Sequence, residues 1–424
     1  MIVQTCYGPV EGVPCDGYTV YRGIRYAKAP VGELRFRPPC RPEPFESVFH
    51  ADRFGPMCPQ DRHDTDSFYD KEFYGAKEFQ PGVSEDCLHL NIWTPPCRGA
   101  EKYPVAVWIH GGAFFNGYNS EVEFDGAEFA RRGVILVTIN YRMGLWGFLC
   151  HPWLAQEDPD GRCGNYGLLD QIFALQYVRE NIGAFGGDPD RVTVFGQSAG
   201  AFSVQALMVS PLTKGLFRQA VLHSGGIDEG FARESTVQAA MKKGEEFMRR
   251  FGISSLEQLR KTPWQLLQTA ANDCFHHRSG MRLYSPVADG FVLPETEEGI
   301  LDSEKAHSIP CILGATANDI PRGGDPDGLM KTCVGFAERT GRIGSAPNYL
   351  YSFRRHLPGD GAGAFHSADL WYLFGTLERS WRPFEERDRE LSRRICDCWC
   401  SFFRTGDPGW KPYTDQERFI EVFE

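Results

Sequence analysis

The stretch that decides the fold runs from Phe185 to Gly200 and reads Phe-Gly-Gly-Asp-Pro-Asp-Arg-Val-Thr-Val-Phe-Gly-Gln-Ser-Ala-Gly. A short apolar run at 192–195 leads into a glycine-rich turn, and residues compatible with a helix follow. Ser198 stands at the apex of this turn, between Gly196 and Gly200. Larger side chains at the two glycines would clash where the chain bends, so small residues here leave the serine hydroxyl exposed.

A strand, a sharp turn and a helix with a serine at the apex resemble the nucleophile elbow of α/β-hydrolases. The motif is short, and in a chain with 46 glycines it can also be a plain turn with a solvent-facing serine. Three further features favour the elbow: the strand before it, a glycine pair upstream, and an acid and a histidine downstream in the right order.

A nucleophilic serine needs a base to take its proton and an acid to orient that base. In α/β-hydrolases the chain order is serine, acid, histidine. Two histidines follow residue 320, His356 and His366. His356 follows two arginines, which disfavour its protonated form and indicate a solvated edge. His366 lies in a loop of small residues after a predicted strand, and we predict that it is the general base.

Many carboxylates lie between the serine and the histidine. Asp319 stands out because it follows the apolar run 309–313 and a series of small residues. Its expected task is to accept a hydrogen bond from the imidazole and to fix its tautomer. The alternative acid is Asp289, which precedes Gly290 and is typical of a turn.

Negative charge that develops on a substrate carbonyl requires backbone N–H donors. Gly111 and Gly112 follow the apolar run 105–109, and paired glycines allow close approach of the main chain. With Ala199 they would supply three donors to an oxyanion hole. The alternative is an ordinary turn at the end of a strand.

The rest of the chain alternates apolar runs with helical spacing. Such alternation predicts an α/β fold with a mostly parallel sheet and helices on both faces, in a single domain of residues 1–424. Residues 231–280 are charged and helical, and we expect a helical insertion over the carboxyl edge of the sheet. Residues 55–83 are expected to form a long surface excursion. The predicted strands are 20–26, 89–94, 105–109, 134–139, 192–195, 219–223, 309–313 and 349–353, with a helix over 168–182.

Composition narrows the function classes. Of 424 residues 42% are apolar, which suffices for a large core, and the net charge of −11 without a basic stripe argues against a nucleic-acid partner. No stretch is apolar enough to span a membrane. Residues 1–20 show no secretory signal, so a cytoplasmic location is expected, with the oligomeric state left open.

The cysteines are predicted to be structural. There are 14 of them, and without a leader we expect them to stay reduced. Cys396, Cys398 and Cys400 form the tightest group, but no nearby histidine or C-x-x-C pair completes a zinc site. A buried helix is the favoured interpretation.

Taken together, these motifs resemble the type-B carboxylesterase family, and the chain looks like a short bacterial-type member. The serine stretch matches the signature of that family, and Glu-Asp-Cys-Leu-His-Leu-Asn-Ile-Trp-Thr-Pro at 85–95 matches a second one except at His89. The resemblance spans nearly the whole chain. Further segments that fit are 21–27, 30–38, 140–142, 164–171 and 405–408.

The resemblance implies an α/β-hydrolase fold and hydrolysis of a small-molecule carboxylic ester, with small to medium apolar acyl groups, through an acyl-enzyme. It implies no metal and no organic cofactor. Two alternatives remain: a serine hydrolase of amide, carbamate or lactone bonds, and a non-catalytic binding protein on the same scaffold. The triad alone does not separate an ester from these other bonds.

The departures from the family pattern make predictions of their own. Asp319 stands where many relatives have glutamate, and Gln197 replaces a frequent glutamate. His366 follows Asp319 by only 47 residues, so we expect a reduced helical cap and a more open site. Relatives often bridge the cysteines that match Cys58 and Cys87, which are expected here to lie close without necessarily being bonded.

Overall fold

The computed structural model of the chain describes residues 1–60, 67–96, 99, 101–226, 236–277, 285–295, 299, 306–322 and 324–424. In these residues twelve strands form one sheet. The strands are β1 Ile2–Gln4, β2 Pro9–Cys15, β3 Tyr18–Arg25, β4 Phe49–Ala51, β5 His89–Thr94, β6 Tyr103–Ile109, β7 Ile135–Ile139, β8 Gly187–Gln197, β9 Gln219–His223, β10 Cys311–Thr316, β11 Asn348–Phe353 and β12 Ile420–Phe423.

The sheet changes from antiparallel to parallel at β7. Its order is β1-β2-β3-β5-β7-β6-β8-β9-β10-β11-β12, with β4 beside β2. From β7 to β12 every neighbouring pair is parallel, whereas β1, β2, β3 and β5 form an antiparallel flank that meets β7. The predicted mostly parallel sheet is therefore confirmed, and each of the eight predicted strands overlaps an observed one.

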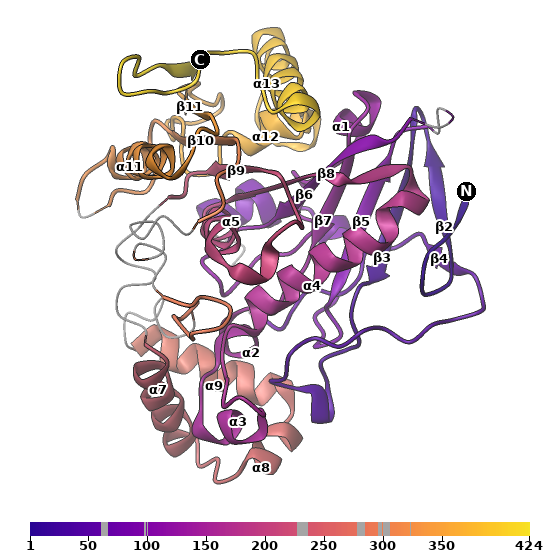
Figure 1. The fold of residues 1–424 in the computed structure, drawn as a ribbon, viewed down its shortest axis with the longest axis vertical. Helices are drawn as coiled ribbons and strands as arrows, with labels where there is room; N and C mark the ends of the chain where they lie inside the picture. Colours follow the sequence, from indigo (N-terminus) through magenta and orange to yellow (C-terminus); the bar gives the residue numbers. More distant parts are fainter. Residues whose placement is uncertain are drawn as a thin grey trace.

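Helices cover both faces of the sheet (Figure 1). α4 and α5 cross the face turned toward the viewer, while α1 and α13 pack on the other. The residues of β6 show the same division, because Val105 and Val107 belong to one core and Ala106 and Trp108 to the other. The α-helices of the described residues are α1 Ala127–Arg131, α2 Gly144–Phe148, α3 Pro152–Glu157, α4 Tyr166–Asn181, α5 Ala199–Val209, α7 Val237–Arg250, α8 Leu256–Lys261, α9 Trp264–His277, α11 Gly328–Ile343, α12 Leu370–Leu373 and α13 Glu386–Thr405.

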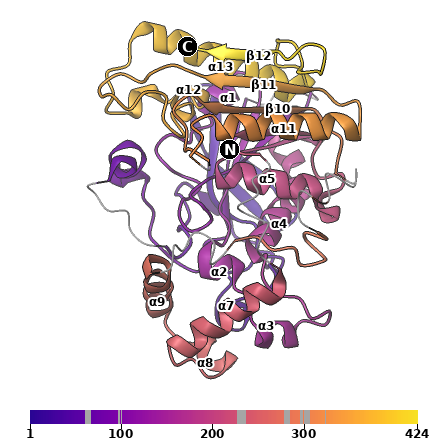
Figure 2. The same cartoon turned by 90° about the vertical axis from the view of Figure 1, so that its left-hand side faces the viewer.

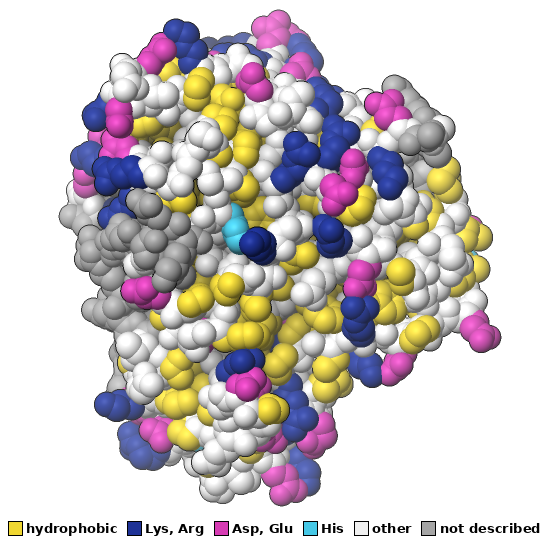
Figure 3. All heavy atoms as spheres, viewed as in Figure 1, with side chains coloured by type: hydrophobic (Ala, Val, Ile, Leu, Met, Phe, Trp, Pro, Cys, Tyr) yellow, Lys and Arg dark blue, Asp and Glu magenta, His cyan; other side chains and the backbone are white. Residues whose placement is uncertain are grey.

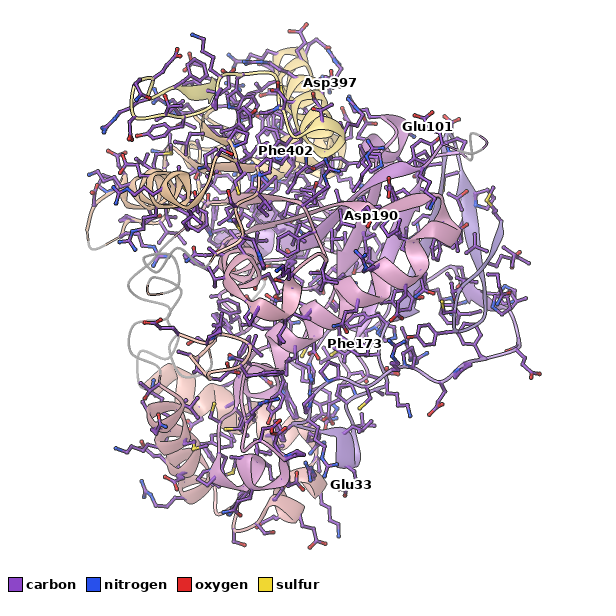
Figure 4. All side chains as sticks on the ribbon, viewed as in Figure 1. Glu33, Glu101, Phe173, Asp190, Asp397 and Phe402 are labelled. Carbon is purple, nitrogen blue, oxygen red and sulfur yellow. The ribbon has the colours of Figure 1, made fainter. Side chains whose placement is uncertain are left out.

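Helix α13 explains the cysteine cluster. Asp397 and Phe402, labelled in Figure 4, lie on its exposed and buried sides. Cys396 and Cys400 are fully buried against the sheet, and Cys398 is only partly buried. The three thiols therefore do not converge, and the predicted buried helix is confirmed.

Helices α7, α8 and α9 gather with α2 and α3 at one end of the molecule, opposite the C-terminal strands (Figures 1 and 2). They fall within the predicted insertion, whose residues 231–235 and 278–280 lie outside the described part. The buried Arg35 joins α8 to the N-terminal segment: it pairs with Glu85 at 2.6 Å and donates to the carbonyls of Leu259, Arg260 and Thr262 at the end of α8.

The expectation of a surface excursion at 55–83 is wrong for residues 55–60, which are buried except at Pro56, whereas 67–83 are exposed or partly exposed except at Asp70, Glu72 and Phe73. The π-helical turn Asp70–Tyr74 buries Phe73, and Glu72 forms an ion pair with the fully buried Arg382 at 2.9 Å. Polar residues and glycines suggested solvent, but the buried partner comes from the C-terminal part of the chain. Residues 61–66 lie outside the described residues.

A buried ion pair ties β7 to α4. Arg142 follows β7, and its guanidinium makes two hydrogen bonds to the carboxylate of Asp170, at 2.7 and 2.8 Å. Both side chains are almost completely buried, at 3% and 0% exposure. Removing one partner of such a pair leaves an uncompensated charge in the core.

Replacing Arg142 with leucine is therefore expected to lower the free energy of unfolding by about 3–5 kcal/mol. Urea unfolding followed by circular dichroism measures the change. The matched control is Arg179→Leu on the exposed surface of α4, whose pairing with Asp190 at 3.6 Å should be worth less than about 1 kcal/mol. A loss at Arg142 no larger than the loss at Arg179 would contradict this expectation.

On the face drawn in Figure 3, Lys and Arg side chains are interspersed with Asp and Glu. Among the described residues of that face, no continuous basic stripe is visible. No helix in the described part of the chain has the length and apolar character needed to cross a membrane.

Candidate active site

The predicted elbow has the expected backbone. β8 ends at Gln197, α5 begins at Ala199, and Ser198 between them has φ 53° and ψ −122°. A positive φ is costly for a residue with a Cβ, and such strain persists only where the surroundings impose it. Here the Ser198 N–H donates to the carbonyl of His223 in β9 at 2.9 Å, which holds the turn.

The glycines beside the serine are required by close contacts. A Cβ at Gly200 would lie 2.0 Å from the carbonyl oxygen of Ile109, and one at Gly196 would lie 2.6 Å from the backbone of Gly200. Since real Cβ atoms do not approach this closely, neither position accepts alanine without movement of β6 or α5. The predicted reason for small residues is confirmed.

Asp319 and His366 lie together. Nδ1 of His366 is 2.5 Å from Oδ1 of Asp319, and both side chains are buried. Burial by itself would raise the pKa of Asp319, but the imidazole of His366 and hydrogen bonds from Ser224 and the Ile320 N–H lower it to about 2. Asp319 is therefore ionised at neutral pH and accepts the Nδ1 proton, which leaves Nε2 of His366 free to accept one.

The loops that carry the acid and the histidine are hydrogen-bonded to each other. Asn318 donates its N–H to the carbonyl of Ala364 and accepts the Ala364 N–H on its side-chain oxygen, both at 2.9 Å. Gly363 has φ 71°, and a Cβ there would lie 2.3 Å from that oxygen. Asn318 thus sets the spacing between the two loops.

Nε2 of His366 points at the elbow. It lies 3.0 Å from Nε2 of Gln197, so the side-chain amide of Gln197 donates to it. In the described part of the chain, no hydrogen bond joins the Ser198 hydroxyl to His366. The two side chains nevertheless line one cavity, and in free enzymes such contacts often tighten only when substrate binds.

That cavity has a volume of about 350 Å³. Ser198, His366, Gly111 and Gly112 line one part of it. Aromatic and aliphatic side chains line much of the remainder, which gives the cavity an apolar character. These apolar lining residues are Tyr69, Phe73, Tyr74, Ala113, Phe115, Phe124, Ile320 and Leu370.

The proposed oxyanion residues surround the serine. A Cβ on Gly111 would lie 3.3 Å from that of Ser198, and Gly112 has φ 96° with a hypothetical Cβ 2.0 Å from the carbonyl oxygen of Asn116. Ala199 is the first residue of α5, so its N–H has no partner within the helix. Gly111 and Ala199 therefore lie next to Ser198, and Gly112 lies in the same loop as Gly111.

Replacing Gly112 with alanine is expected to lower kcat for ester hydrolysis by about 10²- to 10³-fold, because the 111–116 loop must move and its amides leave their positions. Steady-state kinetics on a p-nitrophenyl ester measures the effect. The matched control is Gly161→Ala, which also has a positive φ, of 71°, but has nothing within 4 Å of the added Cβ. Equal kcat values for the two variants would contradict the role of the loop.

Sequence reasoning missed two side-chain contacts of Asp319. The Ser224 hydroxyl donates to Oδ2 of Asp319 at 2.6 Å, and the Thr316 hydroxyl donates to the same oxygen at 2.8 Å. Ser224 has φ 49°, which is unusual for serine. The only signal in the sequence was its place directly after the strand that ends at His223.

The alternatives considered for the triad do not lie at this site. Asp289 accepts the backbone N–H groups of Phe291 and Leu293, at 3.0 and 2.9 Å, as expected for a turn. His356 is exposed, as predicted. Cys58 and Cys87 are buried, free and hydrogen-bonded through their thiols, so the expectation that they lie close is confirmed.

The mostly parallel sheet, with a serine on a strained strand-to-helix turn, defines an α/β-hydrolase. A sequence model described as the carboxylesterase family matches residues 1–322 and 334–421. The chain therefore belongs to the carboxylesterase family.

Known relatives agree with this assignment. The chain is 33% identical to para-nitrobenzyl esterase of Bacillus subtilis over 479 aligned residues, which cover 98% of this chain and 93% of that protein. It is 31% identical to liver carboxylesterase 1F of Rattus norvegicus, over 99% of this chain and 90% of that protein. These relatives identify the chain as a carboxylic ester hydrolase.

Solved structures show the same fold. A para-nitrobenzyl esterase superposes with a TM-score of 0.87 at 33% identity, covering 100% of this chain and 95% of the other. A carboxylesterase of Geobacillus stearothermophilus gives a TM-score of 0.83 at 32% identity, with coverage of 100% and 96%. The predicted α/β-hydrolase fold is confirmed.

Proposed function

We propose that the protein hydrolyses esters of small to medium apolar carboxylic acids through an acyl-enzyme on Ser198. The observation that carries this proposal is the 2.5 Å contact between His366 and Asp319 at the cavity that Ser198 lines. A volume of about 350 Å³ suits an ester of modest size, and the apolar lining suits its hydrocarbon part.

In the first half-reaction the Ser198 hydroxyl replaces the Gln197 amide at Nε2 of His366. His366 takes the hydroxyl proton as Oγ attacks the ester carbonyl, and Asp319 stabilises the resulting imidazolium. The amides of Gly111, Gly112 and Ala199 bind the oxyanion. The imidazolium then donates its proton to the departing alcohol.

In the second half-reaction a water molecule takes the place of the alcohol. His366 removes its proton, the hydroxide attacks the acyl carbonyl, and the same three amides stabilise the second oxyanion. Collapse of this intermediate returns the proton to Ser198 and releases the carboxylic acid. Each step uses only side chains, backbone amides and water.

We also propose that the chain is one domain, with α7–α9 as a reduced cap and an open entrance to the site. Two observations support this. Ser198 is partly exposed rather than buried. The alignment with para-nitrobenzyl esterase extends over 479 positions, more than the 424 residues of this chain, so segments of that relative have no counterpart here.

The test is hydrolysis of p-nitrophenyl esters from acetate to decanoate. The expected result is turnover with an optimum at a short or medium acyl chain and a fall in kcat/KM toward decanoate, because the cavity accommodates a limited length. An optimum at decanoate would contradict the proposed acyl class. Absence of turnover by folded protein for every ester would contradict the mechanism.

A further inference from the structure

The side chain of Gln197 takes no part in the chemical steps of the proposed mechanism, yet it contacts the general base. Gln197 is the last residue of β8 and is buried, with an exposure of 4%. It lines the same cavity as Ser198 and His366. A buried amide needs hydrogen-bond partners, and in this structure the amide N–H of Gln197 is bound to His366.

The general base offers one site to a hydrogen-bond donor. The carboxylate of Asp319 lies 2.5 Å from Nδ1 of His366 and holds the ring proton on that nitrogen. Nε2 of the neutral ring then has a single lone pair with which to accept. The NH2 end of the Gln197 amide faces Nε2 at 3.0 Å and donates to this lone pair. While that hydrogen bond persists, Nε2 cannot take the proton of Ser198.

The other end of the amide reaches the proposed oxyanion loop. Oε1 of Gln197 lies 2.9 Å from the position that a Cβ on Gly111 would take, and Cβ of Ser198 lies 3.3 Å from the same position. The absence of a side chain at Gly111 therefore leaves room for the Gln197 amide. The amide thus lies between the general base and the loop, beside the nucleophile. An ester has to come within reach of these same three groups to be attacked.

The backbone of the elbow is already in place without substrate. The Ser198 N–H is held by the carbonyl of His223, and α5 begins directly after the serine. Among the described residues, the missing element is the hydrogen bond between the Ser198 hydroxyl and His366, and Gln197 occupies the acceptor that this bond requires. The contact with Gln197 therefore accounts for the resting state of the site.

We propose that Gln197 caps Nε2 of His366 in the free enzyme and that an ester displaces the amide as it binds. This inference rests on the proposed function, because it describes how the same site is activated. Gln197 is a positioning residue that acts through His366. The cap stabilises the free enzyme and is lost before the transition state, so it lowers kcat/KM for every substrate.

The moment of displacement decides which kinetic constant carries this cost. An ester that displaces the amide on binding forms a complex in which the base is already free. The cost then appears in the dissociation constant of the ester and leaves the acylation rate constant unchanged. Methanesulfonyl fluoride, in which the Ser198 oxygen displaces fluoride at sulfur, is too small to gain from such a complex. For this reagent the cost appears in the second-order rate constant of inactivation.

The test replaces Gln197 with methionine, which has nearly the same length but no N–H. Inactivation by methanesulfonyl fluoride is expected to become about 2- to 10-fold faster, the change that corresponds to one net hydrogen bond. For p-nitrophenyl butyrate, single-turnover kinetics should show a Kd lower by the same factor and an unchanged acylation rate constant. Gln176→Met, at an exposed position of α4, is the matched control and should leave all three constants as in the wild type.

A second variant, Gln197→Glu, keeps the shape of the amide. Its carboxylate has no hydrogen to donate at pH 8, so the same constants are expected to change in the same direction. If thermal unfolding shows that methionine disturbs the elbow, the glutamate variant carries the test. Faster inactivation of the glutamate variant together with wild-type rates in a stably folded methionine variant would assign the effect to negative charge and overturn the cap.

The outcomes separate the cap from the proposed function. Unchanged or slower inactivation of Gln197→Met would show that the amide does not withhold the base. A faster acylation step with an unchanged Kd would mean that the amide stays on Nε2 in the ester complex, and would also overturn the proposal. Absence of Ser198-dependent hydrolysis by the wild-type protein would refute the proposed function itself, and the cap with it.

A spectroscopic measurement detects the cap without substrate. In protein whose histidines carry the heavy nitrogen isotope, the Nε2 resonance of His366 is expected to move downfield in Gln197→Met, because an imidazole nitrogen that accepts a hydrogen bond resonates upfield of a free one. The Nδ1 resonance should stay in place, since its bond to Asp319 is kept. The spectrum of His366→Asn identifies both resonances by their absence. An Nε2 resonance at the same position with and without Gln197 would overturn the proposal.

Discussion

Replacing Ser198 with alanine is expected to lower kcat for ester hydrolysis by about 10⁴-fold or more while the protein remains folded. The hydroxyl is the proposed nucleophile, and without it His366 and Asp319 have no group to activate. Removing the serine from such a triad costs about as much as removing all three members, because they act as one unit. The residual rate then reflects only binding and the oxyanion amides.

Burst kinetics with p-nitrophenyl butyrate measures this effect directly. Wild-type protein should show a burst of p-nitrophenol equal to the concentration of active sites if deacylation is slower than acylation, and Ser198→Ala should show none. Ser254→Ala, at an exposed position in the α7–α8 connection, is the matched control. A Ser198→Ala variant with near wild-type kcat would rule out the acyl-enzyme on this residue.

Replacing Asp319 with asparagine is expected to lower kcat by about 10⁴-fold. Asparagine has nearly the same shape, but its amide can present N–H to Nδ1 of His366, and the tautomer with the proton on Nε2 is then favoured. Such a histidine cannot accept the Ser198 proton. Without its negative charge, residue 319 also no longer stabilises the imidazolium form of His366.

Kinetics across pH 6 to 9 separates this effect from misfolding, with thermal unfolding recorded on the same samples. Asp289→Asn is the control, because Asp289 was the alternative acid and only its Oδ1 accepts backbone N–H groups in a turn. Full activity of Asp319→Asn, or a larger loss in Asp289→Asn, would move the role of the acid away from Asp319.

The turn at Ser198 and the strands could be predicted because sequence patterns a few residues long determine them. Buried parallel strands appear as continuous apolar runs, so β9 was predicted with the bounds that the structure shows. The bounds of β5 were also predicted correctly, although β5 is antiparallel to both of its neighbours. The two glycines around Ser198 follow from the bend of a single turn. Asp319 and His366 were predictable by a different route, since chain order and the ends of strands left few candidates.

Two parts of the prediction concerned longer segments. The alternation of strands and helices gave the layered architecture correctly. The interpretation of residues 55–83 failed at 55–60, which are mostly buried, and at the turn that buries Glu72, because burial of Glu72 depends on Arg382, 310 residues further along the chain. Local composition carries no information about such a partner.

By itself, the sequence determined the α/β fold, the place of the candidate nucleophile, and the order of the groups expected to act with it. Only the tertiary structure decided which side chains meet there. The contacts of Ser224 with Asp319 and of Gln197 with His366 both depend on packing between distant segments. The reason is physical: periodicity and turn chemistry act over a few residues, whereas the burial and pairing of a polar group are set by whatever part of the chain packs against it.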